Sequence, residues 1–98
     1  MTESLAPHSI LVVDDEPDSL ETLRLLLVDE GFHVRVAADG IEALERIAEL
    51  APDLLIVDIM MPSMTGLDLC RRLRAQAETR DIPCIAYSGL YGDRKSVV

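Results

Sequence analysis

Short apolar runs alternate along the chain with longer segments in which apolar residues recur at helical spacing. Three runs, at residues 10–13, 54–57 and 82–87, are apolar without alternation, which is typical of strands covered on both faces. A fourth run, at residues 32–37, mixes valines with His33 and therefore predicts a strand at a sheet edge. The alternation predicts an α/β domain with a parallel sheet.

Three helices are predicted between these strands. The first begins near Pro17 and ends at Gly31, the second covers about residues 40–50, and the third about residues 65–77. Leu25 points away from the apolar face of the first helix and is expected to be exposed. The expected inward residues are Leu20, Leu23, Leu26 and Leu27 in the first helix, Ile41, Leu44, Ile47 and Ala48 in the second, and Leu67, Cys70 and Leu73 in the third.

Composition and charge narrow the class of protein. A chain of 98 residues that is 49% hydrophobic has material for one core. Its net charge of -9 repels DNA and anionic membranes. No apolar run approaches the roughly 18 residues of a membrane span, and the first residues lack the features of a signal peptide. We therefore expect a cytoplasmic protein that contacts neither nucleic acid nor membrane directly.

The two cysteines, Cys70 and Cys84, fall in apolar surroundings, one in a predicted helix and one in a predicted strand. Neither has the CxxC or histidine spacing of a metal or redox site. A disulfide is not expected in a reducing compartment. Both cysteines are therefore interpreted as small buried hydrophobic residues.

Polar side chains stand at three of the predicted strand ends. Asp14 and Asp15 follow the first strand, Asp58 follows the third and Ser88 follows the fourth. One such aspartate taken alone is most often a turn former or a helix cap. Because ligands bind beyond the carboxyl ends of the strands in open parallel sheets, these residues are expected to meet at one edge.

Three carboxylates that crowd together repel one another, so at neutral pH they raise a pKa or hold a cation. Mg²⁺ suits such a cluster because it takes oxygen ligands and commonly uses one or two carboxylates together with a phosphate. A carboxylate beside bound Mg²⁺ can also attack phosphorus and form an aspartyl phosphate. Ser88 on the adjacent strand could then donate a hydrogen bond to a phosphate oxygen.

Three stretches, ILVVDDEPD, DLLIVDIMMPSMTGLDL and DIPCIAYSG, cover the chain from about Ser9 to Gly89. In order and separation they resemble the signature blocks of response-regulator receiver domains of two-component signalling. The resemblance implies a flavodoxin-like, doubly wound parallel sheet with its visible strands in the order 2-1-3-4.

The resemblance also implies a role for each matching residue. Asp58 resembles the phosphoacceptor, and Asp14 and Asp15 resemble the acidic pair that binds the metal. The backbone carbonyl of Met60 resembles the third protein ligand of the metal. Ser88 resembles the switch hydroxyl of the family.

Beyond Asp58 the resemblance continues and then stops. Pro62 and Gly66 match the loop after the phosphorylated strand, where the family uses a fixed turn and a close backbone approach. The fifth strand, with its Lys followed by Pro, and the fifth helix do not occur in these residues. Tyr87 comes too early for the aromatic switch residue on that strand and is interpreted as a core or loop packing residue.

The expected domain organisation is a tail at residues 1–8 and a receiver domain at residues 9–98 that is incomplete at its C-terminal end. Without the fifth strand and helix, the fourth strand would form an exposed sheet edge, and part of the apolar face of the first helix would be uncovered. We therefore expect self-association, with a homodimer as one form.

The implied function is that of a signalling phosphoacceptor rather than an enzyme. Asp58 would accept a phosphoryl group from a sensor histidine kinase or a phosphotransfer protein, with Mg²⁺ as cofactor, and the domain would switch partner binding. One alternative is a degenerate receiver that binds partners without phosphotransfer, because the usual Lys is missing. Another is a haloacid-dehalogenase-type phosphohydrolase, but that family needs a second Asp two residues after the first, where this chain has Met60.

Overall fold

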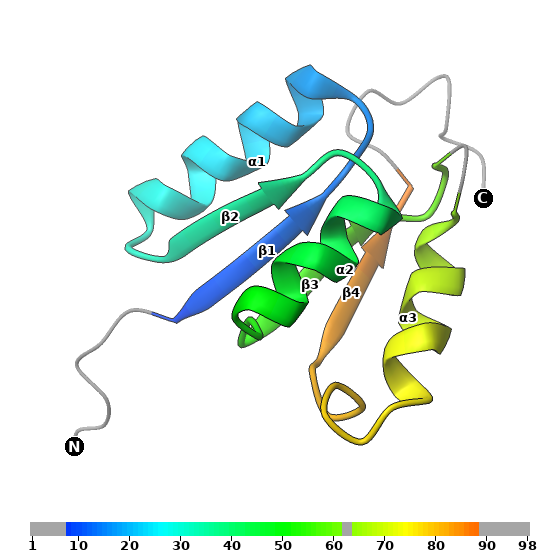
Figure 1. The fold of residues 1–98 in the computed structure, drawn as a ribbon. Helices are drawn as coiled ribbons and strands as arrows, with labels where there is room; N and C mark the ends of the chain where they lie inside the picture. Colours follow the sequence, from blue (N-terminus) through cyan, green and yellow to red (C-terminus); the bar gives the residue numbers. More distant parts are fainter. Residues whose placement is uncertain (1–7, 62–63, 89–98) are drawn as a thin grey trace, which may run out of the picture.

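The computed structural model of the protein describes residues 8–61 and 64–88. Four strands alternate with three helices over these residues (Figure 1). The elements are β1 (Ser9–Val13), α1 (Pro17–Asp29), β2 (His33–Ala37), α2 (Gly40–Glu49), β3 (Leu54–Asp58), α3 (Gly66–Arg74) and β4 (Cys84–Tyr87). All neighbouring strands pair in parallel, in the order β2-β1-β3-β4. The predicted α/β fold and its strand order are confirmed.

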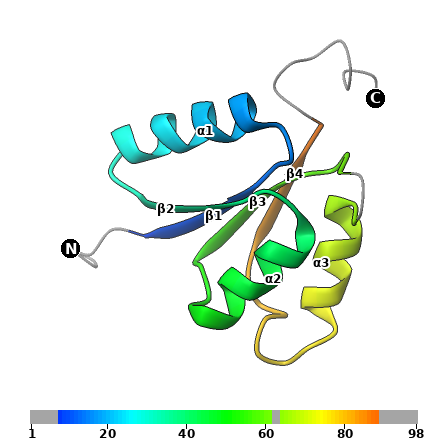
Figure 2. The same ribbon diagram turned by 45° about the horizontal axis from the view of Figure 1, so that its top comes forward.

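The sheet lies between two layers of helix. Figure 2 shows α1 on one face of the sheet and α2 with α3 on the other. The main core fills the space between the sheet and the α2–α3 layer, and alternate residues of the central strands point into it. These strand residues are Leu11, Val13, Leu55 and Val57, all fully buried. The strands thus have a fixed register, and their carboxyl ends reach the same edge.

Side chains fix the points at which α2 and α3 begin. Asp39 precedes α2, and its carboxylate accepts a hydrogen bond from the backbone N–H of Glu42 at 2.8 Å. The Glu42 carboxylate in turn accepts the backbone N–H of Ala38 at 2.9 Å. At α3, the Thr65 hydroxyl accepts the backbone N–H of Asp68 at 3.1 Å. Both caps satisfy amide groups that have no partner within the helix.

The predicted inward faces of α2 and α3 need correction. Gly40, Ala43 and Ile47 are buried in α2, and Leu69 is buried in α3 beside the correctly predicted Leu73. Ile47 and Leu73 are buried as predicted, and Leu44 and Cys70 pack against the core, so the predicted faces were right in part. Three residues predicted to face the core are exposed instead, namely Ile41, Ala48 and Leu67. The inner faces thus combine large residues with the small residues Gly40 and Ala43 of α2.

The buried face of α1 is also narrower than predicted. Its one fully buried residue is Ser19, and Leu26, which was predicted to face inward, is 59% exposed. Leu25 is 53% exposed, as predicted. In Figure 2, α1 lies along the β2 side of the sheet, so the sheet covers only part of its wide apolar surface.

The edge strand β2 is tied to the helix that follows it. The Arg35 guanidinium donates hydrogen bonds to the backbone carbonyls of Arg46, at 2.9 Å, and of Leu50. Both carbonyls belong to the C-terminal end of α2, where the Arg46 carbonyl also accepts the backbone N–H of the cap residue Leu50 at 3.1 Å. The prediction of an edge strand at residues 32–37 is confirmed, and its one arginine caps a helix.

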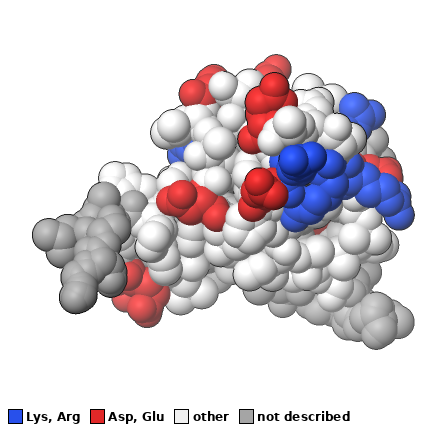
Figure 3. All heavy atoms as spheres, turned by 90° about the horizontal axis from the view of Figure 1, so that it is seen from below, with Lys and Arg blue, Asp and Glu red and all other residues white. Residues whose placement is uncertain are grey.

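Charged side chains of both signs share the surface. Seen from below, arginine side chains gather on one side of the described part of the molecule, with Asp and Glu nearby (Figure 3). Ion pairs on the surface join residues close in sequence, such as exposed Arg71 with Asp68 at 3.0 Å. Exposed pairs of this kind contribute little to stability. Within the described ranges, no helix has the length and hydrophobicity needed to cross a membrane.

Candidate functional site

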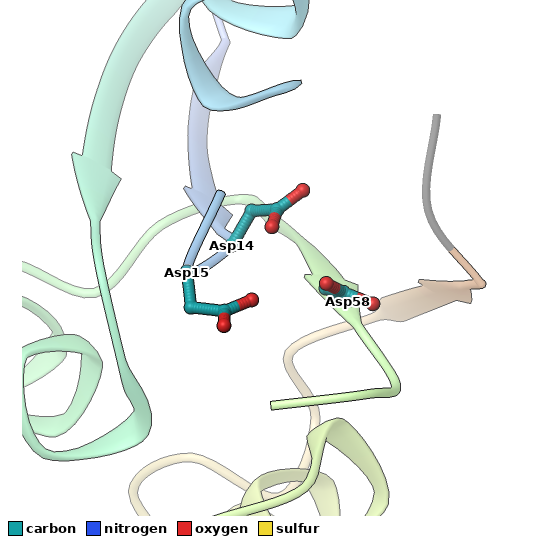
Figure 4. A group of neighbouring side chains, drawn as sticks. All are labelled: Asp14, Asp15 and Asp58. Carbon is teal, nitrogen blue, oxygen red and sulfur yellow. The ribbon is translucent and has the colours of Figure 1, made fainter. Parts of the chain in front are cut away.

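Three carboxylates meet at the carboxyl edge of the sheet. Asp14 and Asp15 follow β1, and Asp58 is the last residue of β3 (Figure 4). Val13 pairs with Val57 in the parallel register, so Asp14 and Asp58 come next on neighbouring strands. Each of the three residues offers one oxygen, and these oxygens lie within 4.8 Å of one another. The structure therefore brings together the three aspartates that the sequence singled out.

Burial makes this cluster electrostatically costly. Asp14 and Asp58 have no exposed surface, whereas Asp15 lies nearer to solvent. Burial raises the pKa of the Asp14 carboxyl. Hydrogen bonds from Tyr87 and from the Glu16 backbone oppose the rise in pKa, and the neighbouring Asp58 adds to it. A buried carboxylate beside others is stabilised by a cation, and an all-oxygen set suits a hard divalent ion such as Mg²⁺.

Backbone amides orient two of the carboxylates. The Glu16 N–H donates to Asp14 Oδ1 at 2.9 Å, and the Met60 N–H donates to Asp58 Oδ1 at 3.0 Å. Met60 is thus the residue whose backbone touches the predicted phosphoacceptor, although its side chain is 55% exposed. The carboxylates are held by the main chain that follows each strand.

Gly66 brings α3 against the backbone of Asp58. Its N–H donates to the carbonyl of Ile59 at 3.1 Å. A Cβ atom at Gly66 would stand only 2.5 Å from the backbone oxygen of Asp58. The close backbone approach expected at this position is therefore present, while Pro62, its predicted companion in the loop, lies outside the described residues.

Ser88 follows β4 at the same edge of the sheet and is half-buried. Tyr87, the residue before it, pairs in register with Asp58 across the β3–β4 ladder. The backbone carbonyl of Tyr87 accepts the N–H of Ile59 at 2.8 Å. The end of β4 is thus hydrogen-bonded to the loop that leaves Asp58.

The sequence profile of the response regulator receiver domain family matches residues 10–98. The chain belongs to this family. The match covers nearly all of the chain and includes every residue of the acidic cluster. The resemblance inferred from the three sequence stretches is confirmed.

Several named proteins are similar to this receiver domain. DNA-binding response regulator MtrA of Mycolicibacterium smegmatis is 50% identical over 68 residues, which are 69% of this chain and 30% of MtrA. Response regulator MprA of Mycobacterium sp. (strain KMS) is 44% identical over 79 residues, 81% of this chain and 34% of MprA. The receiver domain thus spans about a third of the length of the curated relatives it matches.

Solved structures share the fold. The N-terminal domain of a response regulator receiver protein from Methanoculleus marisnigri JR1 has a TM-score of 0.80 and 33% identity, covering 95% of this chain and 75% of that one. Response regulator protein TrrA from Thermotoga maritima, in complex with Mg²⁺-BeF, has a TM-score of 0.69 and 39% identity. That comparison covers 72% of this chain and 62% of TrrA.

One site contact of this receiver domain was missed from the sequence. The Tyr87 hydroxyl donates a hydrogen bond to Asp14 Oδ2. Burial raises the pKa of Tyr87, and the charge of Asp14 adds to the rise, so the hydroxyl stays protonated and acts as a donor. Tyr87 is half-buried, as expected of a packing residue, but its hydroxyl also contacts the site, which the sequence interpretation did not include. The sequence offered one indication of this contact, because Tyr87 carries a hydroxyl and directly precedes the candidate residue Ser88.

The cysteines of the receiver domain lie away from this edge. Cys70 on α3 and Cys84 on β4 are half-buried free thiols that pack against the core, broadly as predicted. The Arg74 guanidinium lies 3.4 Å from the Cys84 sulfur. Burial raises the pKa of Cys70 to about 11, and the nearby Cys84 adds to the rise. A thiol with so high a pKa is a poor nucleophile at neutral pH.

Proposed function

We propose that this receiver domain accepts a phosphoryl group on Asp58 from a sensor histidine kinase or a phosphotransfer protein. The reaction depends on Mg²⁺, and the phosphorylated domain switches its binding to partners. The observation that carries the proposal is the convergence of Asp14, Asp15 and Asp58 within 4.8 Å at one edge of the sheet.

The donor set fits a magnesium ion. Asp14, Asp15 and Asp58 supply carboxylate oxygens, and the backbone carbonyl of Met60 is proposed as a further protein ligand. Mg²⁺ takes oxygen ligands and tolerates waters and phosphate oxygens in its remaining positions. When bound, it would neutralise charge on the transferring phosphoryl group. The comparison with TrrA supports this proposal, since that protein was crystallised with Mg²⁺-BeF.

Asp58 is the nucleophile in this proposal. A carboxylate oxygen of Asp58 forms a bond to phosphorus while the phosphorus–nitrogen bond of a phosphohistidine on the donor breaks, and the freed imidazole takes up a proton. The Met60 N–H, 3.0 Å from Asp58 Oδ1, holds the carboxylate in one orientation. The Ser88 hydroxyl, which follows the neighbouring strand, then donates a hydrogen bond to a phosphate oxygen.

The domain acts as a signalling module in the cytoplasm, and its own residues do not contact nucleic acid. The relative MtrA is named a DNA-binding response regulator, but only 30% of its length is matched by this chain, whose net charge is -9. Such a charge repels a phosphate backbone. The output is therefore proposed to be a protein contact that changes with phosphorylation.

The test is the binding of beryllofluoride, which mimics an aspartyl phosphate. With Mg²⁺ present, wild-type protein should bind it and melt at a higher temperature, because a ligand of the folded state stabilises that state. Asp58→Asn should abolish the shift, and the control Asp81→Asn, at an exposed loop residue, should keep it. An undiminished shift in Asp58→Asn would refute the assignment of the phosphoacceptor.

Incubation with a small-molecule phosphodonor distinguishes the proposed phosphoacceptor from a degenerate receiver that binds partners without phosphotransfer. Acetyl phosphate with Mg²⁺ should give a covalent phosphoryl adduct on the wild-type protein, detected by intact-mass spectrometry, and none on Asp58→Asn. If beryllofluoride binds but no adduct forms, the domain would be an interaction module that retains the acidic site and does not carry out phosphoryl transfer.

A further inference from the structure

Tyr87 reaches across the sheet to the acidic cluster. It is the last residue of β4, and its hydroxyl donates a hydrogen bond to Oδ2 of Asp14, which follows β1. Strand β3 lies between β4 and β1 in the sheet. The side chain therefore spans the end of β3, where Asp58 stands in register with Tyr87.

The chain itself supplies donors to both oxygens of Asp14. Oδ1 accepts the Glu16 backbone N–H at 2.9 Å, and Oδ2 accepts the Tyr87 hydroxyl. The Glu16 donor is part of the main chain at the start of α1 and cannot leave without moving the helix. Tyr87 donates from the end of a side chain that rotates about two single bonds, so its hydrogen bond is the one that can be exchanged.

Packing alone does not require the Tyr87 hydroxyl. A phenylalanine would fill nearly the same volume, and Tyr87 is only half-buried. Its backbone is held separately, because its carbonyl accepts the N–H of Ile59 at 2.8 Å. The side chain can therefore release Asp14 while the strand stays paired.

We propose that Tyr87 is a positioning residue that competes with the divalent cation for Asp14 and thereby links occupancy of the acidic site to the end of β4. This inference rests on the proposed function, since it takes the cation to be Mg²⁺ bound by the aspartates. Binding of the cation draws Asp14 Oδ2 away from the hydroxyl. The freed Tyr87 side chain then changes the surroundings of Ser88, the next residue.

The first test is the affinity of the full chain for Mg²⁺ at pH 8, measured by calorimetry. Tyr87→Phe removes the competing hydroxyl and keeps the ring, so it should bind Mg²⁺ roughly tenfold more tightly than wild type, since a hydrogen bond to a charged group is of that order. The control Asp81→Asn, at an exposed loop residue, should bind as wild type does. An unchanged or weaker affinity in Tyr87→Phe would overturn the inference.

The second test reads Tyr87 directly. The chain has two tyrosines and no tryptophan, so in Tyr91→Phe the near-ultraviolet absorbance of tyrosine comes from Tyr87 alone. Addition of Mg²⁺ should shift this spectrum as the hydroxyl loses its carboxylate partner, and Asp14→Asn in the same background should show no shift. A spectrum that does not respond while Mg²⁺ binds would also overturn the inference.

The two tests separate this inference from the proposed function. One outcome is that Tyr87→Phe changes neither Mg²⁺ binding nor phosphorylation of Asp58. This result would leave the proposed function intact and refute the role of Tyr87. Failure of the wild-type chain to bind Mg²⁺ would overturn both.

Discussion

Replacement of Gly66 by alanine should disturb both the fold and the acidic site. The added Cβ would stand 2.5 Å from the backbone oxygen of Asp58 and 3.1 Å from Cα of Ile59. Both neighbours are main-chain atoms, so no side chain can rotate away. To reach an ordinary contact of 3.4 Å, α3 and the end of β3 must separate by about 0.9 Å.

The expected cost follows from these contacts. Overpacking against rigid neighbours costs about 1–3 kcal/mol. Separation also lengthens the hydrogen bond from the Gly66 N–H to Ile59, which is 3.1 Å in the structure and of a kind that contributes about 1 kcal/mol. The better helix propensity of alanine recovers at most about 1 kcal/mol. We expect a net loss of about 2 kcal/mol, which lowers the Tm of a domain of this size by roughly 10 °C.

Gly40→Ala is the matched control. Gly40 is also the first residue of a helix and also follows a side-chain cap. The Cβ added there would meet the buried Met64 side chain, at 2.6 Å from its sulfur, 3.0 Å from its Cβ and 3.1 Å from its Cγ. These are side-chain atoms of a flexible thioether, which can adjust more easily than the backbone atoms met at Gly66. The loss at Gly40 should therefore be smaller than at Gly66, near the lower end of the cost of overpacking, about 1 kcal/mol.

The assay is thermal melting of both variants with and without beryllofluoride and Mg²⁺. Gly66→Ala should melt well below Gly40→Ala and gain less from beryllofluoride, because the displaced backbone is that of Asp58. Equal melting temperatures and equal ligand shifts in the two variants would show that the approach at Gly66 does not constrain the site.

Three further predictions concern a cap, a charge and a thiol. Asp39→Ala should lower the free energy of unfolding, measured with denaturant, by about 1 kcal/mol, because the Glu42 N–H loses its acceptor. A loss below about 0.3 kcal/mol would mean that water replaces the cap. Without Mg²⁺, Asp14→Asn should melt higher than wild type at pH 7. The raised pKa of Asp14 means that its ionised form weakens the fold, and the difference should shrink as the pH falls toward 3.8; a gap that does not depend on pH would contradict this. Cys70 should react with iodoacetamide only as the pH approaches about 11, rather than near the ordinary 9.0; rapid labelling at pH 8, located by peptide mapping, would show that the thiol is more open than its packing indicates.

The sequence was sufficient to predict the acidic cluster. Asp14 and Asp58 each follow an apolar run, and parallel strands end at one edge whatever the order of the strands. Val13 and Val57, which pair in register, then leave the two carboxylates side by side. This inference needed only the positions of the strands, which continuous apolar runs mark well.

The helix faces and Tyr87 could not be predicted in the same way. Apolar spacing in α2 favoured Ile41, but the buried residues at the start of the helix are Gly40 and Ala43, and Gly40 lies against Met64. A preference for small residues carries no periodic apolar signal. The contact of Tyr87 with Asp14 crosses an intervening strand, so it depends on sheet order and on the direction of one side chain, neither of which local sequence specifies.

The hydrogen bonds from Arg35 to the end of α2 have a consequence for the way the domain opens. An edge strand and the last turn of a helix ordinarily fray independently, each at a low free energy. Here one guanidinium joins β2 to the carbonyls of Arg46 and Leu50, so release of either element breaks the same bonds. The outer part of the sheet and the end of α2 should therefore exchange their amide hydrogens as one cooperative unit.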